Sequence, residues 1–198
     1  EYFMIGGDEL CCAVGDVSGK GIPAALVMAS LQSSLRGLVY GGIQHPAELF
    51  EKLNELFDDA TTKSRFATLF FCRLDPRSGL FTYTSAGHNP ALLVRAEGAL
   101  EWLDVRGIAL GLARSANYPV GAGRLIPGDV MIIYSDGFTE TFNPHGEEYG
   151  ERRLAELALS VRNLPAEQIL DALFGDAERF AAGAPQHDDM TAIVIKRT

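Results

Sequence analysis

The sequence predicts an α+β fold built from mostly antiparallel sheets, and two observations support this. Strand-like apolar runs follow one another through short turns, as in residues 66–74 and 80–85 on either side of Asp75-Pro76-Arg77-Ser78-Gly79. Helical patterns come in two separate pairs, so the regular β-α-β-α alternation of a doubly wound parallel sheet is absent. We therefore expect helix pairs layered on antiparallel sheets.

The first half of the chain contains a strand and a helix pair before that hairpin. An apolar run at residues 10–14 predicts a buried strand that stops at Gly15-Asp16. Pro23 suits the first turn of a helix, which continues with apolar residues at helical spacing until Gly41-Gly42. A second amphipathic helix begins at Pro46.

The second half repeats this pattern of strands and paired helices. Residues 91–95 and 100–103 predict another hairpin, residues 130–134 a strong strand, and residues 191–195 the closing strand. Two helices are expected before that last strand, with apolar stripes formed by Leu154, Leu157, Ala158 and Val161, and by Ile169, Leu170, Leu173, Phe174 and Phe180.

The composition and the net charge argue against several classes of protein. The 198 residues are 47% apolar, which is enough for a buried core, and the net charge of -9 argues against a nucleic-acid partner. An odd count of three cysteines disfavours a disulfide framework and suits the cytoplasm. We expect no membrane segment and no signal peptide. The chain opens at Glu1 without a methionine, so we expect it to be part of a longer polypeptide.

Acidic residues stand at several predicted strand ends, beside glycine or immediately before a strand. They are Asp8, Asp16, Asp136, Asp188 and Asp189. If these carboxylates converge at one sheet edge, their mutual repulsion favours a bound cation, and hard oxygen ligands suit magnesium or manganese. The alternative is that each aspartate is an ordinary turn residue, because Asp-Gly is a common turn dipeptide. A shared site accounts better for the whole set.

Two other chemistries fit the residues less well. The loop from Gly15 to Gly21 follows a strand and opens a helix, but its spacing is not that of a P-loop, so a nucleotide-binding switch is disfavoured. The sequence also contains no Cys-x5-Arg loop and no Gly-x-Ser-x-Gly elbow for a covalent nucleophile. A metal-activated water is the remaining hydrolytic chemistry.

A series of motifs resembles the PPM family of metal-dependent protein phosphatases, in its bacterial SpoIIE/RsbU-like branch. The matching segments appear in family order along nearly the whole chain: Gly6-Gly7-Asp8, Gly15-Asp16-Val17-Ser18-Gly19-Lys20-Gly21, Phe66-Ala67-Thr68, Ala86-Gly87-His88-Asn89-Pro90, Gly107-Ile108-Ala109-Leu110-Gly111, Pro127-Gly128-Asp129, Tyr134-Ser135-Asp136-Gly137 and Asp188-Asp189-Met190-Thr191.

This resemblance implies a fold and a metal site. The fold would be a four-layer αββα sandwich of two antiparallel sheets flanked by helix pairs, forming a single domain over residues 1–198 in the C-terminal part of a multidomain protein. Two manganese or magnesium ions would be bound, and the catalytic residues would be Asp16, Asp136 and Asp188. The metal ligands would be Asp8, Asp16, the Val17 carbonyl, Asp136 and Asp188, with Asp189 as an adjacent candidate.

The resemblance also implies an activity and partners. The domain would hydrolyse phosphoserine or phosphothreonine on a regulatory protein, namely a phosphorylated anti-sigma-factor antagonist, under control of an upstream sensor domain in the same chain. The alternative is a phosphatase-like scaffold or binding module without turnover. A catalytic histidine and a phosphate-binding arginine like those of eukaryotic relatives are not evident in the sequence, so the general acid is unassigned.

Two features leave alternatives open. His88 is either an acid or substrate contact beside the site, or a histidine whose ring bonds within a tight turn, and the second is favoured. Asp8 and Asp16 are only eight positions apart, whereas related domains carry a longer hairpin between the equivalent aspartates. Either that hairpin is lost or a loop between Asp8 and Glu9 is missing from this sequence, and the intact flanking motifs favour the second.

Overall fold

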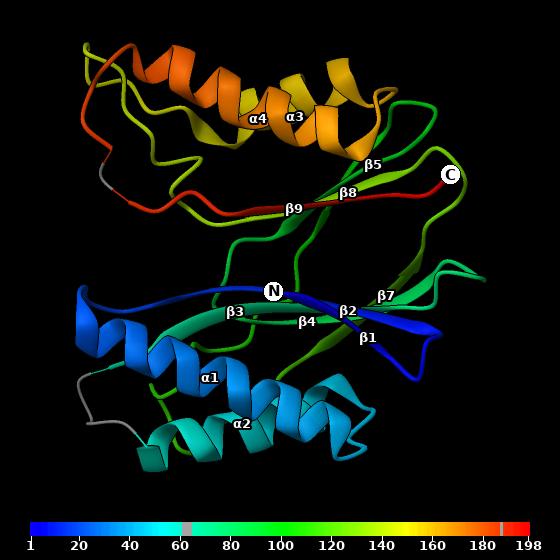
Figure 1. The fold of residues 1–198 in the computed structure, drawn as a ribbon, viewed down its shortest axis with the longest axis vertical. Helices are drawn as coiled ribbons and strands as arrows, with labels where there is room; N and C mark the ends of the chain where they lie inside the picture. The colour runs from blue at the N-terminus through cyan, green and yellow to red at the C-terminus, as the bar shows by residue number, and fades with distance from the viewer. Residues whose placement is uncertain (61–64, 187) are drawn as a thin grey trace. The chain divides into compact units, whose positions relative to one another are not determined.

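The structure, a computed structural model, describes residues 1–60, 65–186 and 188–198. The chain divides into two compact units. Unit 1 comprises Glu1–Pro90 and Asp104–Arg124, and unit 2 comprises Ala91–Leu103 and Leu125–Thr198. Within the described ranges, each unit contains an antiparallel sheet and a pair of helices (Figure 1). The α+β class predicted from the sequence is therefore confirmed.

The sheet of unit 1 has the strand order β1-β2-β3-β4-β7, and its neighbouring strands are antiparallel. The central strands β2 to β4 follow one another along the chain, so their pairings are local and need only short connections. The strands are β1 (Tyr2–Ile5), β2 (Glu9–Val17), β3 (Ala67–Leu74), β4 (Leu80–Ala86) and β7 (Val120–Arg124).

Strand β7 was not predicted, because its sequence Val-Gly-Ala-Gly-Arg has two glycines where a strand normally carries side chains. The structure gives the reason for those glycines. A Cβ added at Gly121 would lie 2.2 Å from the Tyr83 ring, and one added at Gly123 would lie 2.5 Å from the Phe81 ring. The two aromatic rings of β4 thus occupy the space that side chains of β7 would need, and the strand depends on glycine at both positions.

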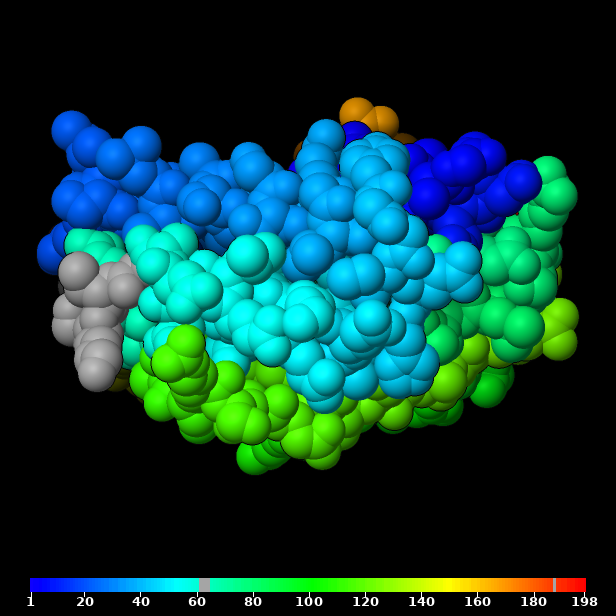
Figure 2. Space-filling model, turned by 90° about the horizontal axis from the view of Figure 1, so that it is seen from below, coloured from blue at the N-terminus to red at the C-terminus, as the bar shows by residue number. Residues whose placement is uncertain are grey.

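Helices α1 (Ile22–Tyr40) and α2 (Pro46–Ala60) cover one face of this sheet. Figure 2 shows the two helices lying side by side on that surface of unit 1. Alternate strand residues such as Cys11 and Phe71 point toward the helices and are buried there with Leu35, Phe50 and Leu53. This alternation gives unit 1 a hydrophobic core on the helical side of its sheet.

Helix α1 has 19 residues and a mean hydropathy of 1.3, so by length and composition alone it is long and apolar enough to cross a membrane. A helix with these properties differs from the expectation that the chain has no membrane segment. Core helices can pass the same test, and α1 contributes the buried Leu31, Leu35 and Val39 to the core of unit 1. The absence of a membrane segment therefore stays a prediction.

Unit 2 has the strand order β6-β5-β8-β9, with antiparallel neighbours. Helices α3 and α4 pack on one face of this sheet, where Leu92, Ile132, Leu154, Ile169 and Leu173 are buried together. The elements are β5 (Ala91–Val94), β6 (Leu100–Leu103), β8 (Val130–Tyr134), α3 (Gly150–Val161), α4 (Ala166–Ala181) and β9 (Ala192–Lys196). Each was predicted from the sequence, with boundaries that differ by a few residues.

Candidate metal centre

Asp16 lies near the end of β2 in unit 1 and is exposed. Its register partner on the neighbouring strand β3 is Thr68, so the two side chains share one face of the sheet. The preceding residue has to be glycine, because a Cβ at Gly15 would lie 2.5 Å from the Thr68 carbonyl oxygen and 2.8 Å from Leu69 Cδ1. The close approach of β3 therefore fixes the backbone immediately before Asp16.

The chain leaves β2 through a tightly bonded loop. Val17 is buried in the core of unit 1, and the Ser18 amide donates to the Phe66 carbonyl at 2.9 Å. The Ser18 hydroxyl accepts a second bond from the Phe66 amide, also at 2.9 Å. Gly19 and Gly21 have φ of +95° and +77°, and α1 begins after them. The backbone around Asp16 and the Val17 carbonyl is thereby anchored on both sides.

His88 stands at the same end of the unit 1 sheet. It follows β4 in the Ala86-Gly87-His88-Asn89-Pro90 segment, and its ring Nδ1 lies 2.9 Å from the Thr68 hydroxyl. The favoured expectation was a ring bonded within its own turn. The structure instead shows a bond to the neighbouring strand, at the residue opposite Asp16.

Asp8 does not lie beside Asp16. It belongs to the turn between β1 and β2, where Ile5 pairs with Glu9, and its exposed carboxylate accepts a bond from Arg77 at 2.5 Å. Asp16 is eight residues further along the extended strand β2, which at about 3.3 Å per residue corresponds to roughly 26 Å. The structure thus departs from the expectation that both aspartates bind the same metal pair.

The turn that contains Asp8 shows how this short segment forms a hairpin. Gly6 and Gly7 have φ of +59° and +82°, and the Asp8 amide donates to the Ile5 carbonyl at 3.2 Å. These left-handed conformations close the hairpin directly. A tight β1–β2 hairpin, with Glu9 paired to Arg73 at 2.6 Å, therefore forms from the sequence as it stands.

In unit 2, Asp136 follows β8 and lies beside the segment that carries Asp188 and Asp189. Ser135 joins the two segments: its amide donates to the Thr191 carbonyl at 2.9 Å, and its hydroxyl donates to the Asp189 carbonyl at 3.0 Å. The Thr191 amide donates back to the Ser135 hydroxyl at 2.9 Å. This clamp places the carboxylates of Asp136 and Asp188 in the same neighbourhood.

The electrostatics of this pair favour a cation. Partial burial, and then the negative charge of Asp188, raise the pKa of Asp136. Carboxylate oxygens are the hard donors that magnesium and manganese prefer, so the residues fit such an ion. Among residues 1–60, 65–186 and 188–198, no cluster of three His, Cys, Asp or Glu residues suited to an ion is found. The backbone carbonyl of Asp189 is bonded to Ser135, and its side chain is exposed.

A cavity of about 290 Å³ adjoins these carboxylates within unit 2. Gly137, Glu140 and Asp188 line one part of it, and Ala177 and Ala181 of α4 line another. The cavity therefore combines acidic groups with an apolar wall, an arrangement suited to an organic group bound beside a cation.

One basic residue beside the loop that follows Asp16 was not predicted from the sequence to belong to the site. Arg65 precedes β3, and its Nη1 is 3.6 Å from the position of a Cβ at Gly19. That Nη1 is buried and has no hydrogen-bond partner among the residues that the structure describes. A lone arginine before an apolar strand gives no sequence signal, because its position relative to Gly19 depends on the pairing of β2 with β3.

The family model of stage II sporulation protein E (SpoIIE) matches residues 6–198. The chain belongs to the SpoIIE family. This match spans every aspartate considered above, from Asp8 to Asp189.

Individual SpoIIE-family relatives support the assignment. The phosphoserine phosphatase RsbU of Bacillus subtilis is 29% identical over 197 residues, a match that covers 99% of this chain and 58% of that protein. The chain thus spans little more than half of this relative. The solved structure of the RsbU and RsbW domains of Rv1364c from Mycobacterium tuberculosis is 32% identical, with a TM-score of 0.78, over 96% of this chain and 52% of that one.

The SiaA-PP2C domain of Pseudomonas aeruginosa extends the likeness in fold. It has a TM-score of 0.86 and 19% identity, covering 99% of this chain and 78% of that one. At this identity the comparison shows the fold alone. This member of the SpoIIE family therefore has the PP2C phosphatase fold, as the motif series implied.

Proposed function

We propose that this chain is the phosphatase domain of a metal-dependent protein serine/threonine phosphatase. The observation that carries the proposal is the SpoIIE-family match over residues 6–198, within which the strand-end aspartates are retained. The name of the relative RsbU, a phosphoserine phosphatase, supports phosphoserine as the substrate group. Hydrolysis would use water, because no covalent nucleophile motif is found in the sequence.

We assign metal binding to Asp16, the Val17 carbonyl, Asp136 and Asp188, and keep Asp189 as an adjacent candidate. The family motifs support the assignment, as does the charge coupling of Asp136 and Asp188 within unit 2. Divalent ions held there would supply an activated water and offset charge on the phosphoryl oxygens. Asp8 is left out, because it pairs with Arg77 at the far end of β2.

The residues around these ligands would set the geometry of the reaction. Gly15 and Ser18 hold the backbone on either side of Asp16, and Ser135 holds the Asp188–Asp189 segment beside Asp136. Water would attack phosphorus opposite the seryl or threonyl oxygen, whose bond to phosphorus breaks. Groups held in place within each unit favour this reaction because they need no rearrangement during it.

The decisive test measures release of inorganic phosphate from a phosphoserine protein with and without manganese. The wild-type chain should release phosphate only with the metal, and Asp16→Asn should abolish release. Asp8→Asn is the matched control and should keep the wild-type rate, because its carboxylate lies at the opposite end of β2. Manganese should also raise the melting temperature of the wild type and of Asp8→Asn, but not that of Asp136→Asn.

The choice of partner is a separate proposal. The resemblance of the motif series to the SpoIIE/RsbU-like branch supports a phosphorylated anti-sigma-factor antagonist as the substrate, in a cytoplasmic signalling pathway and without a nucleic-acid partner. The net charge of -9 agrees with a protein partner rather than a nucleic acid. Loss of phosphate from such an antagonist, but not from an unrelated phosphoserine protein, would support this choice.

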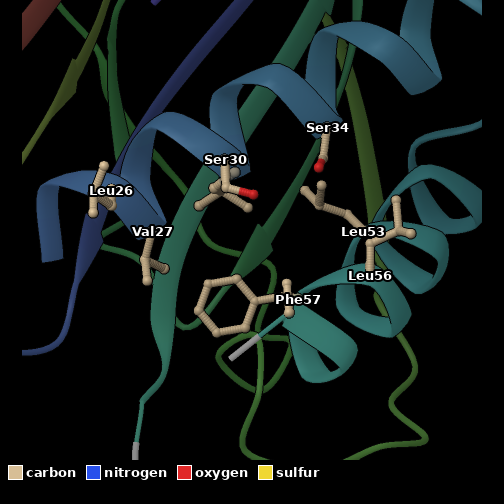
Figure 3. A pocket seen from close by; sticks show the side chains of 9 residues that line it. Leu26, Val27, Ser30, Ser34, Leu53, Leu56 and Phe57 are labelled. Atoms are coloured by element: carbon tan, nitrogen blue, oxygen red, sulfur yellow. The ribbon is translucent and has the colours of Figure 1, made fainter. Parts of the chain in front are cut away.

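We further propose that an upstream sensor domain acts through the helix pair of unit 1. An apolar groove of about 190 Å³ lies between α1 and α2, lined by Leu26, Val27, Leu53, Leu56 and Phe57 among others (Figure 3). None of the described residues that line it is titratable, so the groove suits contact rather than chemistry. Leu26→Ser should change regulation in the longer protein while leaving the isolated domain active.

One observation favours a binding module without turnover as a second candidate. The resemblance assigns a metal to Asp8, and the structure puts Asp8 at the hairpin turn instead. A folded sample that binds a phosphoprotein but releases no phosphate with manganese or magnesium, over several phosphoproteins, would establish the binding module.

A further inference from the structure

The His88 turn is built to hold its imidazole in one place. The Ser85 hydroxyl accepts a bond from the His88 amide at 3.1 Å and donates to the His88 carbonyl at 3.2 Å. Gly87 has a φ of +67°, and a Cβ there would meet Ala109 at 3.2 Å. The turn is therefore closed by Ser85 and packed closely against residue 109, so its backbone has little freedom.

Three side chains line up at this end of the unit 1 sheet. Asp16 on β2 is the register partner of Thr68 on β3, so their Cβ atoms lie about 5 Å apart on one face. The Thr68 hydroxyl is 2.9 Å from Nδ1 of His88, which follows the end of β4. Thr68 consequently links the imidazole of His88 to the strand position opposite Asp16, whose carboxylate is assigned to metal binding.

The contact with Thr68 determines which ring nitrogen can deliver a proton. In the imidazolium form both ring nitrogens carry a proton, so Nδ1–H can donate to the Thr68 hydroxyl while Nε2–H remains available for transfer. Thr68 thus orients the ring and leaves Nε2 as the nitrogen that delivers the proton. Imidazole is the side chain best suited to proton transfer near neutral pH.

We propose that His88 is the proton donor to the serine or threonine oxygen that leaves phosphorus. This inference rests on the phosphatase function proposed above. As water bonds to phosphorus, the bond from phosphorus to the seryl or threonyl oxygen breaks and its electron pair goes to that oxygen. The His88 imidazolium gives its Nε2 proton to this oxygen, so the products are a neutral alcohol and a neutral imidazole. The proton lost by the attacking water restores the imidazolium through solvent, and no oxidant or reductant is needed.

The experiment compares two substrates that differ in their need for a proton. A phosphoserine peptide has a poor leaving group, whereas p-nitrophenyl phosphate releases a phenolate that leaves without protonation. His88→Asn retains an amide that can bond to Thr68 but cannot act as an acid. It should lower kcat for the peptide by about 10²–10⁴-fold and for p-nitrophenyl phosphate by less than about threefold.

Matched controls separate proton donation from folding and metal binding. His145→Asn changes an exposed histidine in unit 2 and should leave both rates unchanged. His88→Asn should keep the wild-type melting temperature and its rise with manganese, and His88→Gln serves as the second variant if the first does not fold. Thr68→Val should lower the peptide rate more than the p-nitrophenyl phosphate rate, because the ring loses its orienting bond.

The outcomes distinguish this inference from the proposed function. An equal loss on both substrates, or an unchanged peptide rate in His88→Asn, overturns the assignment of the proton donor. A wild-type chain that hydrolyses neither substrate with manganese overturns the phosphatase function itself. A selective loss on the peptide, with an unchanged manganese response, supports His88 as the acid.

Discussion

Replacing Asp129 with alanine should unfold unit 2 at markedly lower denaturant concentration. This carboxylate is fully buried and accepts three bonds: from Arg95 at 2.8 Å, from the Ala96 amide at 2.9 Å and from the Ile126 amide at 3.0 Å. It thereby ties the β5–β6 hairpin to the turn before β8. The change removes both acceptor oxygens and all three bonds at once.

The magnitude follows from the partners that lose their bonds. The Ala96 and Ile126 amides, in part-buried bonds, would each lose a partner at about 1–3 kcal/mol. Arg95 would be penalised less, because it keeps Glu101 at 2.8 and 3.0 Å. We expect a loss of about 4 kcal/mol in the free energy of unfolding, close to that for breaking a buried ion pair. The melting temperature should fall by about 8–16 °C.

Urea unfolding followed by tryptophan fluorescence measures this loss directly. The chain's single tryptophan, Trp102, lies on β6 in unit 2, so it reports on the unit that contains Asp129. Glu156→Ala is the control, because its ion pair with Arg152 on α3 is exposed and should not shift the midpoint. A loss below about 1 kcal/mol for Asp129→Ala would refute the argument that the buried carboxylate organises this turn.

Three further predictions test other parts of the structure. Leu53→Ala, at a fully buried position of α2, should lower the free energy of unfolding by about 2–5 kcal/mol in the same urea titration. Burial raises the pKa of Cys11 and Cys12 to about 12, so at pH 8 the folded protein should not react with a disulfide reagent, whereas the unfolded chain should react fully. Gly137→Ala should abolish the rise in melting temperature with manganese, because its Cβ would lie 2.4 Å from the Asp189 carbonyl; an undiminished rise would contradict the steric argument.

The sequence predicted the elements whose signals are local. The turn at residues 75–79 and the helix starting at Pro46 were recoverable because proline, glycine and apolar spacing act within a few residues. Strand β7 was missed because its glycines are required by the rings of Tyr83 and Phe81, which come from another strand. Strand β1 was missed because its pairing depends on a turn formed by residues 6–8.

At the candidate site too, local motifs could be recognised in the sequence, whereas contacts that depend on strand pairing could not. Motif order proposes Asp16, Asp136 and Asp188 as site residues, but it does not state at which end of a strand each residue stands. The register of β1 against β2 decided the position of Asp8, and the register of β2 against β3 brought Thr68 opposite Asp16. The contact between Thr68 and His88 follows from a third strand and could not be derived from spacing.

The glycines beside the aspartates are required for different reasons, and the reason distinguishes an aspartate in a turn from a candidate site residue. Gly6 and Gly7, before Asp8, have positive φ, so there glycine serves the turn and the turn interpretation holds. Gly15 and Gly137 do not have positive φ. A Cβ at Gly15 would lie 2.5 Å from one backbone carbonyl oxygen, and a Cβ at Gly137 would lie 2.4 Å from another. At these two positions glycine is required because a neighbouring segment approaches closely. Such an approach sets the position of an adjacent carboxylate, as metal binding at Asp16 and Asp136 requires.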